Sequence, residues 1–177
     1  MNTSSNTNSA RTQAYFTLLV LLAELAHLTW EHFHGGVLSH HLLNNKELPA
    51  LSNAWGALLL PALAWFLFGL VAPRISGGVI AAFLGAILYG ALFSAAFATD
   101  QEALLPYLFF GLPLIGLVLP IYRGEYLLGF VLGMTFTFGA VLPMLVGSVV
   151  AAWSALFHLV IRRIFVQALV WFRRMQT

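Results

Sequence analysis

Acidic and histidine side chains recur at helical spacing in the first fifth of the chain. In the stretch AELAHLTWEHFHGGVLSHH, Glu24, His27, Glu31 and His34 are separated by three, four and three residues. An α-helix has about 3.6 residues per turn, so these four side chains would share one helix face. The stretch holds two of the six acidic residues and five of the six histidines of a chain that is 60% hydrophobic and 8% charged. This clustering predicts a functional polar site.

The residue types of the stripe suit a metal. Carboxylates and imidazoles without thiolates are ligands for zinc, iron, manganese or copper(II). After the stripe, Gly35 and Gly36 allow the chain to turn, so that the next histidines can fold back over it. We therefore predict a transition-metal site, structural or Lewis-acidic, built from Glu24, His27, Glu31, His34, His40 and His41. The spacing differs from the H-E-x-x-H motif of zinc proteases, and the residues do not select one metal.

The same side chains allow two other functions. A carboxylate near the centre of a bilayer costs about 3 kcal/mol on insertion scales, so Glu24 must face the protein interior, a wet cavity or a partner. Glu24 and His27 could relay protons or line a solute path through a small transporter. They could instead be a buried hydrogen-bonded pair in a membrane scaffold without chemistry. Metal binding would be lost below about pH 6 as histidines protonate, whereas a relay would work in metal-free protein.

Long apolar runs must position these residues. A helix needs about 20 apolar residues to cross a bilayer, and the sequence predicts spans at 15–34, 53–71, 77–98 and 103–121, followed by two more within 126–161. We place the turn of this last pair at Pro143 and Gly147. One long bent helix, giving five spans, is the alternative. Gly129 and Gly133 form a small-xxx-small pair, which allows close helix approach.

Charge placement orients the predicted bundle. With the N-terminus inside, the cytoplasmic side holds seven of the eight basic residues, as the positive-inside rule requires: Arg11, Arg74, Arg123, Arg162, Arg163, Arg173 and Arg174. We therefore expect an all-α, polytopic transmembrane bundle of about six spans with both termini cytoplasmic. Its parts are a disordered polar tail (1–13), the membrane domain (14–161) and a basic amphipathic C-terminal segment (162–177).

The connection between the first two spans, SHHLLNNKELPALSNAW, is the longest polar loop of the chain. Loops of this length are uncommon unless they have a function or fold locally, and this one is placed to cover the stripe as a lid or to form a plain hairpin. Ser52 or Asn53 could cap the second span.

Several functions are excluded. The chain has no cysteine for a disulfide, a thiolate metal site or a nucleophile. Its only lysine, Lys46, lies in a predicted outer loop, which excludes a retinal Schiff base. Phosphate-binding glycine loops and nucleotide motifs are absent. We expect the lipid bilayer as the main partner, allow a homo-oligomer, expect no nucleic acid, and place the protein in the bacterial inner membrane.

Overall fold

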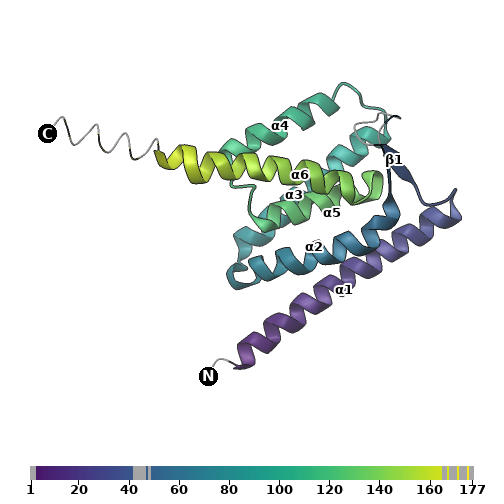
Figure 1. The fold of residues 1–177 in the computed structure, drawn as a ribbon, viewed down its shortest axis with the longest axis horizontal. Coiled ribbons are helices and arrows are strands. Elements are labelled where there is room, and N and C mark those ends of the chain that lie inside the picture. The colour runs from purple at the N-terminus through teal and green to yellow at the C-terminus, as the bar shows by residue number, and fades with distance from the viewer. Residues whose placement is uncertain are drawn as a thin grey trace.

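The structure is a computed structural model that describes residues 3–41, 47, 49–164, 167, 171 and 175. This part of the chain is almost entirely helical, as predicted, with one small two-stranded sheet (Figure 1). The helices are α1 (Thr3–Phe33), α2 (Gly56–Val71), α3 (Gly77–Ala98), α4 (Leu105–Val118), α5 (Gly124–Phe138) and α6 (Val141–Ala155). Short 3-10 turns, η2 (Asn53–Trp55) and η3 (Ala72–Arg74), flank α2, and a π-helical segment, η4 (Leu156–Ile161), extends α6.

Four helical stretches of the described chain are long and apolar enough to cross a membrane: Ser9–Phe33, Asn53–Arg74, Gly77–Ala98 and Val141–Ile164. α4 and α5 are apolar as well but contain only 14 and 15 residues. Both are shorter than the roughly 20 residues that a hydrocarbon core requires. The count of six spans therefore stays a prediction.

α5 is the central helix of the bundle. It packs closely along α3, because a Cβ atom added to Gly129 or Gly133 would overlap the carbonyl oxygen of Phe83 or Ile87 on α3. The close approach predicted for these two glycines is thus confirmed. On its other side α5 supplies Leu128 and Val131 to a buried core shared with α1 and α2, which contribute Val20, Leu60, Ala64 and Leu67.

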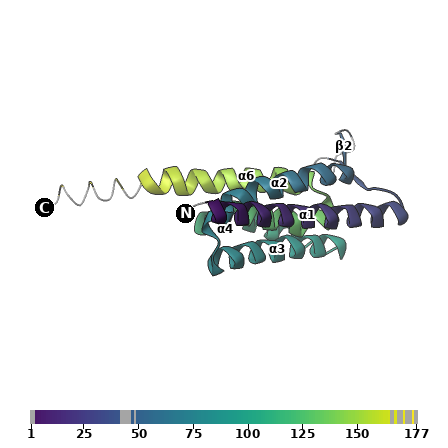
Figure 2. The ribbon, with the colours of Figure 1, turned by 90° about the horizontal axis from the view of Figure 1, so that it is seen from below.

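α1 packs along α2 and diverges from it toward the N-terminus (Figure 1). Viewed from below, α1 passes in front of the bundle, and its outline falls between those of α2 and α3 (Figure 2). Phe16 anchors this position, since its ring stacks on Phe68 of α2 at 5.0 Å and meets Phe83 of α3 edge-on at 6.3 Å. The polar stripe of α1 therefore faces other helices of the bundle.

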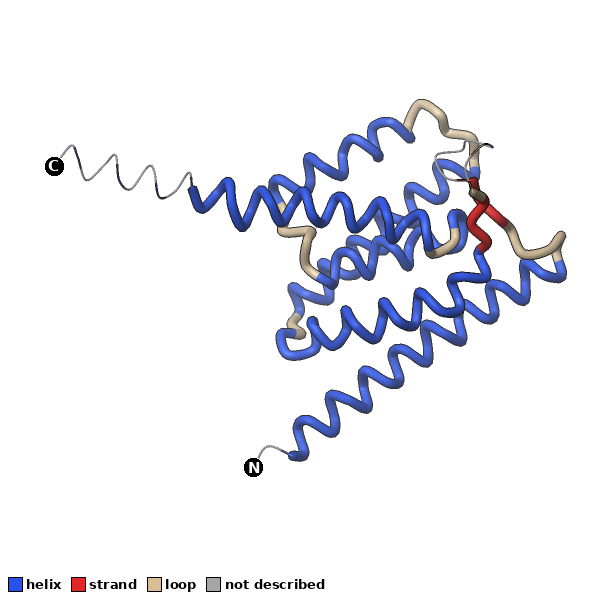
Figure 3. Tube along the Cα trace, viewed as in Figure 1, coloured by secondary structure: helices blue, strands red, loops and turns tan. Residues whose placement is uncertain are grey.

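Strands β1 (Ser39–His41) and β2 (Ala50–Ser52) pair antiparallel at the end of the bundle where α1 ends and α2 begins (Figure 3). The pairing follows a sharp turn at Gly35 and Gly36, whose φ angles are +124° and +97°. Positive φ is readily adopted only by glycine, so the predicted turn at these residues is confirmed. We call this end of the molecule the hairpin end.

One predicted boundary differs from the structure. The turn between α5 and α6 lies at Gly139, with φ +66°, and not at Pro143 and Gly147. Pro143 falls in the first turn of α6, where a backbone N–H has no intrahelical acceptor and proline is tolerated. Gly147 lies within α6, where it packs against the Leu127 side chain of α5.

At the N-terminus α1 begins at Thr3, and the disordered tail expected over 1–13 stays a prediction. No proline or glycine interrupts the chain before Gly35. At the other end, helix continues through residues 162–164, and most of the predicted C-terminal segment lies outside the described residues.

Candidate functional site

Two of the four stripe residues on α1 are buried inside the bundle, and a third is mostly buried. Glu24 and Glu31 are each 2% exposed, and the His27 side chain is 9% exposed. The expectation that Glu24 faces the interior is confirmed. His34 differs, because it is exposed, its ring stacks on Trp30 at 4.7 Å, and its Nδ1 lies 2.8 Å from the carbonyl oxygen of Trp30.

The His27 imidazole lies between the two buried carboxylates. Its Nδ1 is 3.5 Å from Oε2 of Glu24, and its Nε2 is 3.4 Å from Oε1 of Glu31. The spacings of three and four residues place one carboxylate a turn before the ring and the other a turn after it. The three side chains therefore form a row along the helix, which we call the Glu-His-Glu row.

The hairpin end holds the last member of the row in place. The Asn53 side-chain Nδ2 donates to Oε1 of Glu31 at 2.6 Å, and the Leu38 backbone N–H donates to Oε2 at 3.2 Å. The Asn53 backbone N–H also donates to the Leu38 carbonyl at 2.9 Å. The chain that turns at the two glycines thus closes over Glu31 with backbone and amide groups.

Close contacts with glycine and an aromatic ring complete the walls of the site. Gly56 of α2 leaves room for the Glu24 carboxylate, since a Cβ at this position would overlap Oε1. Gly139 likewise leaves room for the Asn53 side chain, since a Cβ at this position would overlap Oδ1. The Phe136 ring of α5 lies 4.9 Å from the His27 ring. The row is therefore in close contact with α2 through Glu24 and with α5 through His27.

The described side chains do not support the predicted metal site. Among them, no group of three or more histidine, cysteine or acidic residues could hold one ion. The geometry gives the reason: the two ring nitrogens of His27 face different carboxylates, whereas a metal needs its donors about 2.1 Å from a single point. The backbones of His40 and His41 pair with Leu51 and Ala50, and their side chains lie outside the described part of the structure.

Sequence reasoning missed several residues of the site. It considered Asn53 only as a helix cap, but the capping role belongs to Ser52, whose Oγ accepts from the Ala54 N–H at 3.2 Å. Asn53 instead contacts Glu31, 22 residues away. Gly56 and Gly139 were also missed. A polar residue at the start of an apolar span was the available signal for Asn53, and no local pattern marked the glycines.

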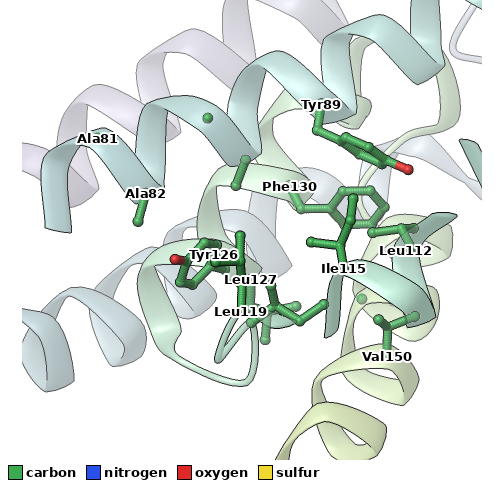
Figure 4. Close-up of a pocket in the computed structure, with 14 residues that line it drawn as sticks. Ala81, Ala82, Tyr89, Leu112, Ile115, Leu119, Tyr126, Leu127, Phe130 and Val150 are labelled. Atoms are coloured by element: carbon green, nitrogen blue, oxygen red, sulfur yellow. The ribbon is translucent and has the colours of Figure 1, made fainter. Parts of the chain in front are cut away.

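A cavity of about 400 Å³ opens beside the row, between α1, α2, α3 and α5. Its walls include Val20, Glu24, His27, Leu60, Thr135 and Phe136. A second cavity of about 300 Å³ lies between α3, α4, α5 and α6 and is lined almost wholly by apolar side chains (Figure 4). Its polar groups include the Tyr89 hydroxyl, which donates to the Leu108 carbonyl at 2.6 Å. Of these two cavities, the first is the one that adjoins a carboxylate and an imidazole.

No protein-family model, curated protein or solved structure matches the chain. The chemistry of the site must be judged from its own geometry. An imidazole can accept a proton at one nitrogen while it releases another from the second nitrogen. A ring with a carboxylate at each nitrogen is arranged for that exchange.

Proposed function

We propose that this protein is a polytopic membrane protein that moves protons through the Glu-His-Glu row, either alone or coupled to a solute. The observation that carries the proposal is the position of His27, with one buried carboxylate 3.5 Å from Nδ1 and another 3.4 Å from Nε2. In the proposed topology six helices span the bacterial inner membrane, both termini are cytoplasmic, and the hairpin end faces outward.

The relay step conserves protons and charge. A protonated Glu24 passes its proton to Nδ1 of His27, and the resulting imidazolium gives the proton on Nε2 to the Glu31 carboxylate. The ring is left neutral with its proton on Nδ1, and the starting tautomer is restored when Nδ1 releases that proton to water and Nε2 takes up a proton from water. Both contacts are longer than a strong hydrogen bond, so transfer occurs when thermal motion shortens them.

A structural role alone explains the row less well. Each ionisable group within an apolar span is costly, and a buried ion pair is weak evidence for stability, because well-packed apolar residues often replace it without loss. Here three such groups occur in succession on one helix, beside a cavity. Proton exchange gives each of these three ionisable groups a function that a structural role does not require.

Proton flux into liposomes tests the proposal. The purified protein is reconstituted with an internal pH-sensitive dye, and a potassium diffusion potential drives protons inward. We expect flux well above that of empty vesicles, and a loss of at least tenfold in His27→Asn. His32→Asn is the matched control, because His32 lies on the same helix but is exposed, and its flux should stay within twofold of the parent.

Two results would overturn the proposal. One is a folded parent protein that conducts no faster than empty vesicles, which would leave the structural role. The other is flux that a chelator abolishes and one transition metal restores, which would return the site to metal chemistry.

A further inference from the structure

The polar face of α1 continues past Glu24 toward the opposite end of the bundle. Gln13 and Thr17 precede Glu24 by eleven and seven residues, which places them on the same side of the helix. The Gln13 side-chain Nε2 donates to the Trp65 carbonyl of α2 at 2.8 Å. Polar groups therefore follow α1 along most of its length.

Two buried oxygen atoms on this face have no hydrogen-bond partner among the described residues: Oγ1 of Thr17 and Oε1 of Glu24. A buried polar oxygen without a partner costs about 1–3 kcal/mol, and a bound water molecule is the usual remedy. The two atoms are seven residues apart, or about 10 Å along the helix axis. Two or three water molecules in a row would join them.

Val20 lies between Thr17 and Glu24 along α1. It is 7% exposed and belongs to the buried core with Leu60 and Ala64 of α2. It also lines the cavity of about 400 Å³ that reaches Glu24 and His27. The polar face is thus interrupted by one apolar side chain, next to a space large enough for water.

We propose that Val20 is a hydrophobic gate in the proton path, separating Gln13 and Thr17 from the Glu-His-Glu row. This inference rests on the proposed proton function and adds the position at which the proton path is closed. An apolar constriction stops conduction by excluding water, and the path conducts when water enters the cavity beside Val20 and connects the two oxygens.

Isosteric substitutions test the gate in the liposome assay. Val20→Thr keeps the side-chain shape and adds a hydroxyl, so we expect proton flux to rise at least threefold. Thr17→Val removes the hydroxyl on the other side of the gate, and we expect flux to fall at least threefold. Leu18→Thr is the control, because Leu18 is 50% exposed on the outer surface of α1, and it should leave flux unchanged.

The outcomes separate the gate from the relay. Unchanged flux in both Val20→Thr and Thr17→Val, with flux still lost in His27→Asn, would overturn the gate and leave the relay standing. A parent and a Val20→Thr variant that both fail to conduct while folded would overturn both. Thermal unfolding in detergent shows that each variant is folded before flux is compared.

Discussion

Gly56 determines how closely the Glu24 carboxylate lies against α2. The carboxyl oxygen Oε1 occupies the space where any larger residue would place its Cβ. This contact aligns Glu24 with His27, since a carboxylate displaced from α2 would no longer lie at 3.5 Å from Nδ1.

We expect Gly56→Ala to lower the stability of the folded protein by about 1–3 kcal/mol, as overpacking of a tight site does. Proton flux should fall in the same variant, because Glu24 moves. The control is Gly85→Ala, since Gly85 is also helical and an added Cβ there meets nothing within 4 Å. Equal melting temperatures for the two variants in detergent would contradict the tight contact.

Asn53 holds the Glu31 carboxylate from the hairpin end. Asn53→Ala removes the amide that donates to Glu31 at 2.6 Å and leaves a buried carboxylate with the Leu38 N–H and the longer contact to His27. A hydrogen bond to a charged group contributes about 1.5–3 kcal/mol, so we expect a loss of that size. Gln101→Ala, which removes an exposed amide, should change the melting temperature little. A loss no greater in Asn53→Ala than in this control would show that the amide does not stabilise Glu31.

For these residues the sequence predicted which side chains are buried better than it predicted which groups they contact. The cost of a carboxylate in an apolar span was enough to turn Glu24 away from lipid, and the structure buries Glu31 as well. Whether His27 would chelate a metal with them or bridge them depended on the orientation of its ring. Phe136 packs against the ring and Asn53 holds Glu31 beside it; both lie on other elements, and helical spacing carries no information about them.

Among the elements, η3 and α5 are joined by an ion pair at the end of the bundle opposite the hairpin. Arg74 donates to both carboxylate oxygens of Glu125, at 3.1 and 2.8 Å. Glu125 is 2% exposed and lies in the first turn of α5, where the helix dipole also favours a negative charge. The hairpin end and the opposite end of the bundle are thus each held by a buried carboxylate with donors from another element.

We expect Arg74→Ala to destabilise the protein by about 2–4 kcal/mol, because it leaves a buried carboxylate without its cation. The Arg74 side chain is 34% exposed, which places the expected loss toward the lower end of that range. Arg123→Ala removes an exposed arginine near the same end and should cost less than about 1 kcal/mol. Adding Glu125→Gln to Arg74→Ala should recover part of the loss. No recovery in a double-mutant cycle would argue against direct coupling of the pair.

Element boundaries followed from the sequence where glycine, proline or charge marked them. The predicted third span, 77–98, matches α3, and the proline-rich fourth span contains α4. The last hairpin was divided at the wrong residues, because Pro143 was taken as a helix breaker although proline fits a first helical turn. The turn belongs to Gly139, whose positive φ no composition rule distinguishes from the other glycines of the same run.

At the scale of the whole molecule, the absence of cysteine from the sequence makes the topology easy to test. We expect Gln101→Cys to react with a membrane-impermeant thiol reagent in intact cells, because the α3–α4 loop is proposed to face outward. Ile75→Cys, in the α2–α3 loop, should react only after the membrane is permeabilised. Both native side chains are exposed, so burial does not confound the comparison. The reverse labelling pattern would invert the proposed orientation.

The apolar length of the runs predicted a helical membrane bundle, but not how its helices are layered. α5 is among the shortest helices and yet the central one, because its glycines let α3 approach and its other faces meet α2 and α6. Such packing depends on pairs of residues far apart in the chain. Mean hydropathy is nearly the same for the second, third and last of the four long spans, at 2.0, 2.1 and 2.0, and therefore does not rank them by burial.

The most direct test of the relay geometry is nitrogen-15 NMR of the His27 imidazole in detergent-solubilised protein, with the other five histidines replaced. We expect Glu24→Gln to shift the Nδ1 resonance and leave Nε2 nearly unchanged, and Glu31→Gln to do the reverse. That pattern would show one carboxylate at each ring nitrogen, as the distances of 3.5 and 3.4 Å require. If both substitutions shifted the same nitrogen, or neither shifted any, His27 would not bridge the two carboxylates.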